Sequence, residues 1–169
     1  MRADELREIQ KPIKARYRED PEAAQITLEA EGRLDEGITC SVGTGSAVAR
    51  AGLHPATGGD TLSLCSGDML LQALVACAGV TLRAVATSLD IPVAAGLVRA
   101  EGDLDFRGTL AVSKDAPVGF SVIRLHFQLE SDATEEQLET LVRLTERYCV
   151  VYQTLAGSPT LSVSSARTG

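Results

Sequence analysis

The sequence predicts an α+β protein with a mostly antiparallel sheet built around one long central helix. Alternating apolar and polar residues occur on both sides of a long and almost entirely apolar stretch. A capping box, Thr134 to Gln137, then opens a second helical pattern. The order of strands, long helix, strands, helix and strand differs from the regular alternation of a parallel βαβ fold.

The first residues differ from the rest of the chain. Residues 3–18 are charged, weakly amphipathic and interrupted at Pro12. We expect residues 1–20 to form an N-terminal arm, with a helix as one option, that packs on another surface or frays. A chain of 169 residues is the size of one domain, so residues 21–169 are expected to form a single domain.

The next segment predicts a hairpin. Residues 25–31 and 38–42 alternate with a period of two around a glycine-bounded turn, which is typical of half-buried strands. Cys40 falls on the apolar face and is expected to be a small buried residue, whereas Arg33 lies in the turn. A further strand and a glycine-rich loop are expected within residues 43–65, and the loop lacks the lysine of a P-loop.

The central helix is expected to begin at a cap, Ser66 or Asp68, and to run to about Leu89. A helix of roughly 24 residues would be about 36 Å long. Apolar residues lie on nearly every face, so we expect the helix to be surrounded by other elements. Cys77 lies in its middle.

The second half of the chain returns to strand patterns. Residues 98–106 and 123–130 alternate, and His126 falls on the polar face, where a solvated histidine is expected. After the capping box, Cys149 lies on or near the core-facing stripe of a helix. Residues 160–165 predict a last short strand.

Composition limits the partners and cofactors. With 16 Lys and Arg against 23 Asp and Glu, the net charge is −7, which argues against nucleic acid or an anionic membrane as the main partner. The most apolar stretch, residues 69–80, is short for a bilayer, and residues 1–20 lack a signal-like apolar segment. We therefore expect a cytoplasmic protein. The four cysteines and two histidines lack zinc-ligand spacing, so we expect neither metal nor cofactor.

Four stretches together resemble the OsmC/Ohr family of osmotically inducible and organic-hydroperoxide-resistance proteins. They are EAEGRLDEG, HPATGGD, SGDMLLQALVACAGVTLRAVA and LTERYC, and the resemblance covers about residues 20–167. The family pattern has an acidic residue at the start of a long helix, a run of Leu and Ala, a cysteine, and a second cysteine near the end of a later helix. Here Asp68 lies nine residues before Cys77, and Cys149 lies 72 residues after it.

The resemblance implies an OsmC-like fold, an intertwined homodimer and active sites where two subunits meet. It implies Cys77 as the peroxidatic cysteine, Cys149 as the resolving cysteine, Arg33 as the activating arginine and Asp68 as the acid that holds this arginine. Arg16 and Arg18 are alternatives to Arg33. The chain departs from the family pattern at Val150, where many members have proline, and at Asp68, where glutamate is usual.

The expected function is that of a thiol-dependent peroxidase that reduces organic hydroperoxides in oxidative-stress defence. A thiolate attacks the peroxide, and the resulting sulfenic acid condenses with a second thiol, which an external dithiol then regenerates. An alternative is a module that binds a hydrophobic ligand or senses redox state without turnover. A third hypothesis, a metal-dependent hydrolase, requires His54 and His126 near cysteines. Cys65 is an extra thiol at the helix start, where packing is its usual role.

Overall fold

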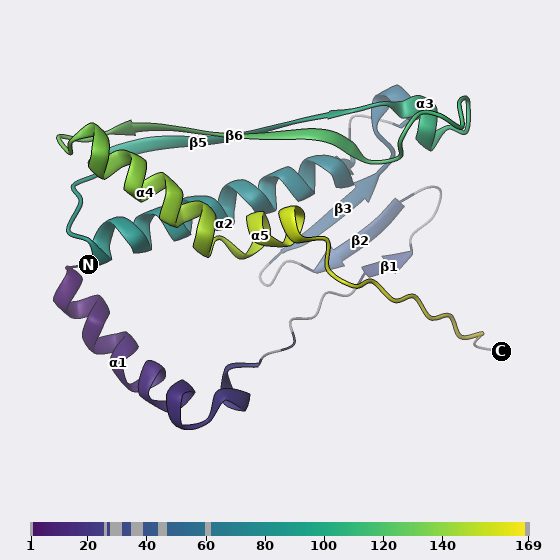
Figure 1. Cartoon of the computed structure of the whole chain (residues 1–169). Coiled ribbons are helices and arrows are strands. Elements are labelled where there is room, and N and C mark those ends of the chain that lie inside the picture. The colour runs from purple at the N-terminus through teal and green to yellow at the C-terminus, as the bar shows by residue number, and fades with distance from the viewer. Residues whose placement is uncertain are drawn as a thin grey trace.

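The protein is described here by a computed structural model, which covers residues 2–25, 27, 32–34, 39–43, 47–59 and 62–167. Its centre is helix α2 (Ser66–Ser88), and a long hairpin runs along one side of this helix (Figure 1). The hairpin consists of β5 (Ala95–Leu104) and β6 (Phe120–Glu130), which pair antiparallel. Helices α4 (Glu135–Tyr148) and α5 (Val150–Gly157) cover a second side of α2. The α+β class is confirmed.

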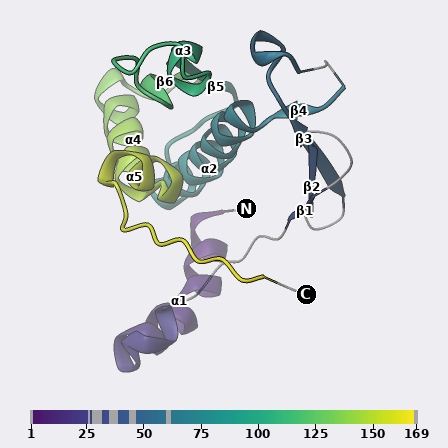
Figure 2. The same cartoon turned by 90° about the vertical axis from the view of Figure 1, so that its right-hand side faces the viewer.

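A smaller sheet lies apart from the hairpin, to one side of the N-terminal part of α2 (Figure 2). Its order is β1 (Gly32–Leu34), β2 (Thr39–Gly43), β3 (Val48–Gly52) and β4 (Leu64–Cys65). The first three strands are antiparallel, and only the short β3–β4 pair is parallel. A 3₁₀ turn, η2 (Pro55–Thr57), lies between β3 and β4 in the chain.

The core lies between α2, α4 and the inner face of the hairpin. Helix α2 buries one residue per turn, and these are Leu74, Ala78, Leu82 and Ala86. A spacing of four residues keeps these side chains on one face of the helix. Leu141 of α4 and Cys149 are both 0 % exposed, and they belong to the two clusters into which this face packs.

Helix α2 corrects three expectations. It begins at Ser66, and its N-cap is Cys65, whose backbone is extended because β4 leads directly into the helix, so neither Ser66 nor Asp68 is the cap. Within one chain it is not surrounded, since Val80 is 72 % exposed. It is also long and apolar enough to cross a bilayer by length and composition alone. Here it is the core helix of the fold.

Other expectations were wrong at the ends of elements. Arg33 lies in strand β1, opposite Ser41 of β2, rather than in the turn. Residues 160–165 do not form a strand, because they have no strand partner among the described residues, and Val163 is 98 % exposed. Phe106 begins a short helix, α3 (Phe106–Thr109), instead of ending a strand. Most of the strand expected at residues 25–31, and the side chain of Cys40, lie outside the described residues.

The N-terminal arm is helix α1 (Ala3–Glu19), which is followed by the 3₁₀ turn η1 (Pro21–Ala24). The helix continues through Pro12 instead of being interrupted there. Only its first residue, Ala3, is buried, and the helix runs away from the domain (Figure 1).

Candidate functional site

Cys77 and Cys149 lie side by side, although 72 residues separate them in the sequence. Cys77 lies midway along α2 and is half-buried, and Cys149 is fully buried. Both belong to one apolar cluster with Leu74 and Ala78 of α2. The fold thus brings together the two cysteines that the sequence singled out.

Cys149 is the junction between α4 and α5. Its extended backbone (φ −73°, ψ 110°) makes it both the C-cap of α4 and the N-cap of α5. Its N–H donates to the Thr145 carbonyl at 2.9 Å, and its own carbonyl accepts from the Gln153 N–H at 2.9 Å. The Gln153 side chain also donates to the Glu146 carbonyl, 2.8 Å away, near the end of α4. These bonds fix the change of direction at which α5 begins.

The first turn of α5 faces the sulfur of Cys77. Burial opposes ionisation of Cys77, but four hydrogen bonds favour the thiolate and together hold its pKa below the ordinary cysteine value. They come from the Val151 N–H, the Cys149 thiol, the Val150 N–H and the Thr81 hydroxyl. Free N–H groups at a helix N-terminus, together with the helix dipole, are suited to stabilise an anion. The site therefore contains a built-in thiolate cradle.

The pKa of Cys149 moves in the opposite direction. Burial raises it, and the adjacent Cys77, as hydrogen-bond acceptor and as negative charge, raises it further. The N–H groups of Tyr152 and Val151 offset only part of this effect. Of the two thiols, Cys77 is therefore the one that ionises more readily, and a thiolate is a stronger nucleophile than a thiol.

The other residues that the sequence proposed are not brought to Cys77 within the described part of the chain. Asp68 lies in the first turn of α2, about 14 Å along the axis from Cys77, and lines a different pocket with Leu71 and Gln72. The side chain of Arg33 lies outside the described residues. Arg16 and Arg18 are exposed on α1. The roles of Arg33 and Asp68 stay predictions.

Sequence reasoning missed the three groups that, with Cys149, hold the Cys77 thiolate. Thr81 had a signal, because a residue four positions after Cys77 lies on the same face of the helix. The N–H groups of Val150 and Val151 had none. Neither glycine nor proline marks the break between α4 and α5, so the sequence gives no sign that a new helix begins after Cys149.

Neither histidine lies at the dithiol. The His54 ring stacks on Phe106 with centroids 5.0 Å apart, and its Nδ1 accepts the Ala56 N–H at 3.1 Å. His126 lies on the outer face of the hairpin, 3.9 Å from Glu101. The part of the chain that the structure describes contains no cluster of three or more His, Cys, Asp or Glu side chains suited to a metal ion.

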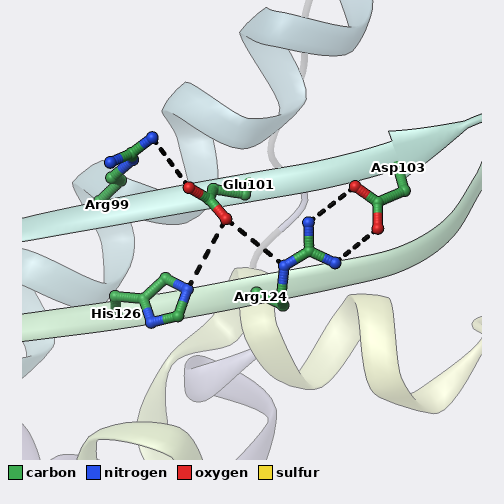
Figure 3. A network of polar contacts seen from close by, with 5 residues as sticks. All are labelled: Arg99, Glu101, Asp103, Arg124 and His126. Atoms are coloured by element: carbon green, nitrogen blue, oxygen red, sulfur yellow. Dashed lines mark hydrogen bonds and ion pairs between the residues drawn. The ribbon is translucent and has the colours of Figure 1, made fainter.

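The outer face of the hairpin carries a charged network, which Figure 3 shows from close by. Arg124 of β6 is paired with Asp103 at 2.5 Å and with Glu101 at 3.4 Å, and Glu101 also contacts Arg99 at 2.8 Å. Arg124 of β6 stands opposite Glu101 of β5 and carries the opposite charge, so the network supports the strand pairing. It lies on the face of the hairpin opposite to the dithiol.

A family model described as OsmC-like protein matches residues 58–164. The chain belongs to the OsmC-like family. The matched region contains both Cys77 and Cys149, whereas Arg33 and helix α1 precede it. No curated protein matches the sequence.

Solved structures share the OsmC-like fold at low sequence identity. An OsmC-like protein from Mycoplasma pneumoniae is 18 % identical, with a TM-score of 0.67, and the match covers 79 % of this chain and 89 % of that one. An organic hydroperoxide resistance protein from Elizabethkingia anophelis is 15 % identical (TM-score 0.63, 79 % and 90 % covered). An organic hydroperoxide resistance protein OsmC from Legionella pneumophila is 16 % identical (TM-score 0.61, 78 % and 90 % covered). At these identities the likeness establishes the fold.

Proposed function

We propose that this OsmC-like protein is a cysteine peroxidase that reduces organic hydroperoxides, with Cys77 as the peroxidatic and Cys149 as the resolving residue. The observation that carries the proposal is the division of roles in the pair. Cys77 is half-buried, and hydrogen bonds from N–H groups lower its pKa, whereas the adjacent Cys149 is buried and its pKa is raised. The descriptions of the Legionella and Elizabethkingia proteins support the same chemistry.

The reaction is written in three balanced steps. The Cys77 thiolate attacks one peroxide oxygen, the O–O bond breaks, and the alkoxide takes a proton to leave as an alcohol, with a sulfenic acid on Cys77. The Cys149 thiol then attacks the Cys77 sulfur, forms the disulfide and releases water. An external dithiol reduces this disulfide by thiol–disulfide exchange and is itself oxidised to a disulfide.

The surroundings of the pair favour an organic substrate. Several partly buried apolar or aromatic side chains pack against the cluster that holds both sulfurs, among them Val98, Ile123, Leu125 and Tyr152. Such surroundings favour an alkyl or aryl hydroperoxide over hydrogen peroxide, because transfer of the apolar group from water to an apolar site lowers its free energy.

The remaining parts of the proposal concern the assembly. We place Arg33 and Asp68 at the active site as the activating pair. Because Asp68 is about 14 Å along the helix from the Cys77 of its own chain, such a pair is expected to act on the Cys77 of a second subunit in a homodimer. The exposed Val80 on α2 is in keeping with a face that another subunit covers. The reducing cytoplasm is the compartment that suits free thiols.

The test is hydroperoxide consumption by the purified protein with a dithiol such as dithiothreitol. Cumene hydroperoxide should be consumed, and Cys77→Ser should lower the rate by on the order of 10³ or more, because a serine hydroxyl does not ionise at neutral pH. Cys65→Ser is the matched control, since Cys65 is also a half-buried cysteine but lies at the start of α2, away from the Cys77–Cys149 pair. Full activity in Cys77→Ser would contradict the proposal, as would a wild-type protein that consumes neither cumene hydroperoxide nor tert-butyl hydroperoxide.

A further inference from the structure

Helices α4 and α5 follow one another directly, and the extended backbone of Cys149 interrupts the helical hydrogen-bond ladder between them. The Cys149 N–H still donates to the Thr145 carbonyl at 2.9 Å, as in a helix. In a continuous helix the next bond would join the Val150 N–H to the Glu146 carbonyl, because each N–H donates to the carbonyl four residues before it. Here the Val150 N–H is hydrogen-bonded to Cys77 instead. The interruption thus supplies a donor to Cys77 and deprives the Glu146 carbonyl of its helical partner.

The side chain of Gln153 takes the place of this missing partner. Its Nε2 atom donates to the Glu146 carbonyl at 2.8 Å, across seven residues of chain. The Gln153 N–H also donates to the Cys149 carbonyl at 2.9 Å, which is the first helical bond of α5. Gln153 therefore joins the last turn of α4 to the first turn of α5 by two bonds, one from its side chain and one from its backbone.

The residues at the junction do not by themselves enforce this interruption. Val150 and Val151 are β-branched, which lowers helix propensity slightly, but neither is a helix breaker such as proline or glycine. A continuous helix is therefore the competing local arrangement, and it would use both N–H groups for carbonyls of α4. Interactions that exist only in the interrupted arrangement decide between the two. They include the Gln153 side-chain bond and the packing of Val151 and Tyr152 against the apolar cluster.

We propose that Gln153 is a positioning residue, which binds the Glu146 carbonyl and thereby leaves the Val150 N–H to Cys77. Its side chain is exposed and bonded to α4, so it acts through the first turn of α5 and not on the sulfur itself. As a residue of the reaction, Gln153 rests on the proposed function. Its effect on Cys77 can nevertheless be measured without any turnover of hydroperoxide.

The test replaces the Gln153 amide by an apolar group of similar length, in Gln153→Met, and measures iodoacetamide alkylation of Cys77 across pH in the reduced full-length protein. Without the side-chain bond, the Glu146 carbonyl competes with Cys77 for the Val150 N–H. The pKa of Cys77 should rise, and its alkylation rate at neutral pH should fall about two- to fivefold. At a pH above the cysteine range the rate should equal that of the wild type, because the thiol is then ionised in both proteins.

Two further variants separate this role from a general effect on α5. Thr154→Met is the matched control, since Thr154 is the next exposed residue of the helix and receives the same side chain. It should leave the pH profile of Cys77 unchanged. Val150→Pro lacks the N–H through which Gln153 acts, so adding Gln153→Met to Val150→Pro should cause no further loss, whereas two independent effects would add.

Several results would overturn the inference. One is a wild-type pH profile in Gln153→Met, and another is an equal shift in Thr154→Met. A loss of the same size at every pH would also overturn it, since this would indicate altered access to the sulfur and not altered ionisation. So would a full additional loss when Gln153→Met is added to Val150→Pro. A wild-type protein without peroxidase activity would contradict the proposed function but not this result.

Discussion

Cys77 and Cys149 share one apolar cluster but differ in what surrounds each sulfur. Cys77 projects from the middle of a helix, where its own backbone N–H is already used, and it receives its hydrogen bonds from α5, Cys149 and Thr81. Cys149 lies at a helix junction and is fully buried. Donors that another element supplies thus lower the pKa of Cys77, whereas burial and the adjacent Cys77 raise the pKa of Cys149.

The largest expected effect comes from removing the resolving thiol. In the wild type, one equivalent of hydroperoxide should form the Cys77–Cys149 disulfide and lower the intact mass by about 2 Da. Cys149→Ser should instead gain about 16 Da as the Cys77 sulfenic acid, because the second thiol is missing. Intact mass spectrometry distinguishes the two outcomes, and Cys65→Ser should behave as the wild type. A disulfide that persists in Cys149→Ser would show that another cysteine resolves the sulfenic acid.

A smaller effect is expected from deleting one donor of the cradle. Val150→Pro removes the N–H that faces Cys77 but should keep α5, because proline suits the first position of a helix and the extended backbone of Cys149 suits the residue before proline. The pKa of Cys77 should rise and the peroxidase rate at neutral pH should fall about three- to tenfold.

The control for this variant is Val150→Ala, which shortens the side chain but keeps the N–H. Stopped-flow measurement of hydroperoxide reduction, together with circular dichroism to verify that α5 and α4 persist, separates the two effects. If Val150→Pro and Val150→Ala lose the same activity, the N–H is not what activates Cys77.

The smallest effect is expected at Thr81. Thr81→Val keeps the shape of the side chain and removes the hydroxyl that hydrogen-bonds Cys77. Because three other donors remain, the rate at neutral pH should fall only about two- to fourfold. Thr87→Val is the matched control, since the Thr87 hydroxyl bonds the Arg83 carbonyl at 2.8 Å near the far end of the same helix. A loss as large as that of Val150→Pro would contradict this ranking, because the Thr81 hydroxyl would then matter as much as the Val150 N–H.

Much of this fold follows from local patterns in the sequence. The alternation of residues 123–130 predicted β6, and the capping box predicted the start of α4. In this capping box the Thr134 hydroxyl accepts the Gln137 N–H at 3.3 Å. Each pattern is read from residues that contact one another within a turn or along a strand. The strand expected at residues 160–165 failed because an alternating pattern also needs a neighbouring strand edge.

The site was predictable only in part. That Cys77 and Cys149 would meet followed from the family resemblance, because packing of α2 against the α4–α5 junction is a tertiary contact without a local signal. The donors at Val150 and Val151 are backbone N–H groups. They are available to Cys77 because a helix begins at Val150, and the residue types around this position do not show that a helix begins there. Arg33 was predicted to lie in the turn but lies in β1, because the end of this strand is set by the pairing of β1 with β2.

The most direct test of the account is the order in which the two sulfurs titrate. Iodoacetamide alkylation rates, measured for each cysteine by peptide mass spectrometry across pH in the reduced protein, report the thiolate fraction of each residue. The account predicts that Cys77 reacts at a pH below the ordinary cysteine range and slows as the pH falls through its lowered pKa, whereas Cys149 stays protonated until the pH exceeds that range. Equal titration of both cysteines, or ionisation of Cys149 before Cys77, would contradict it.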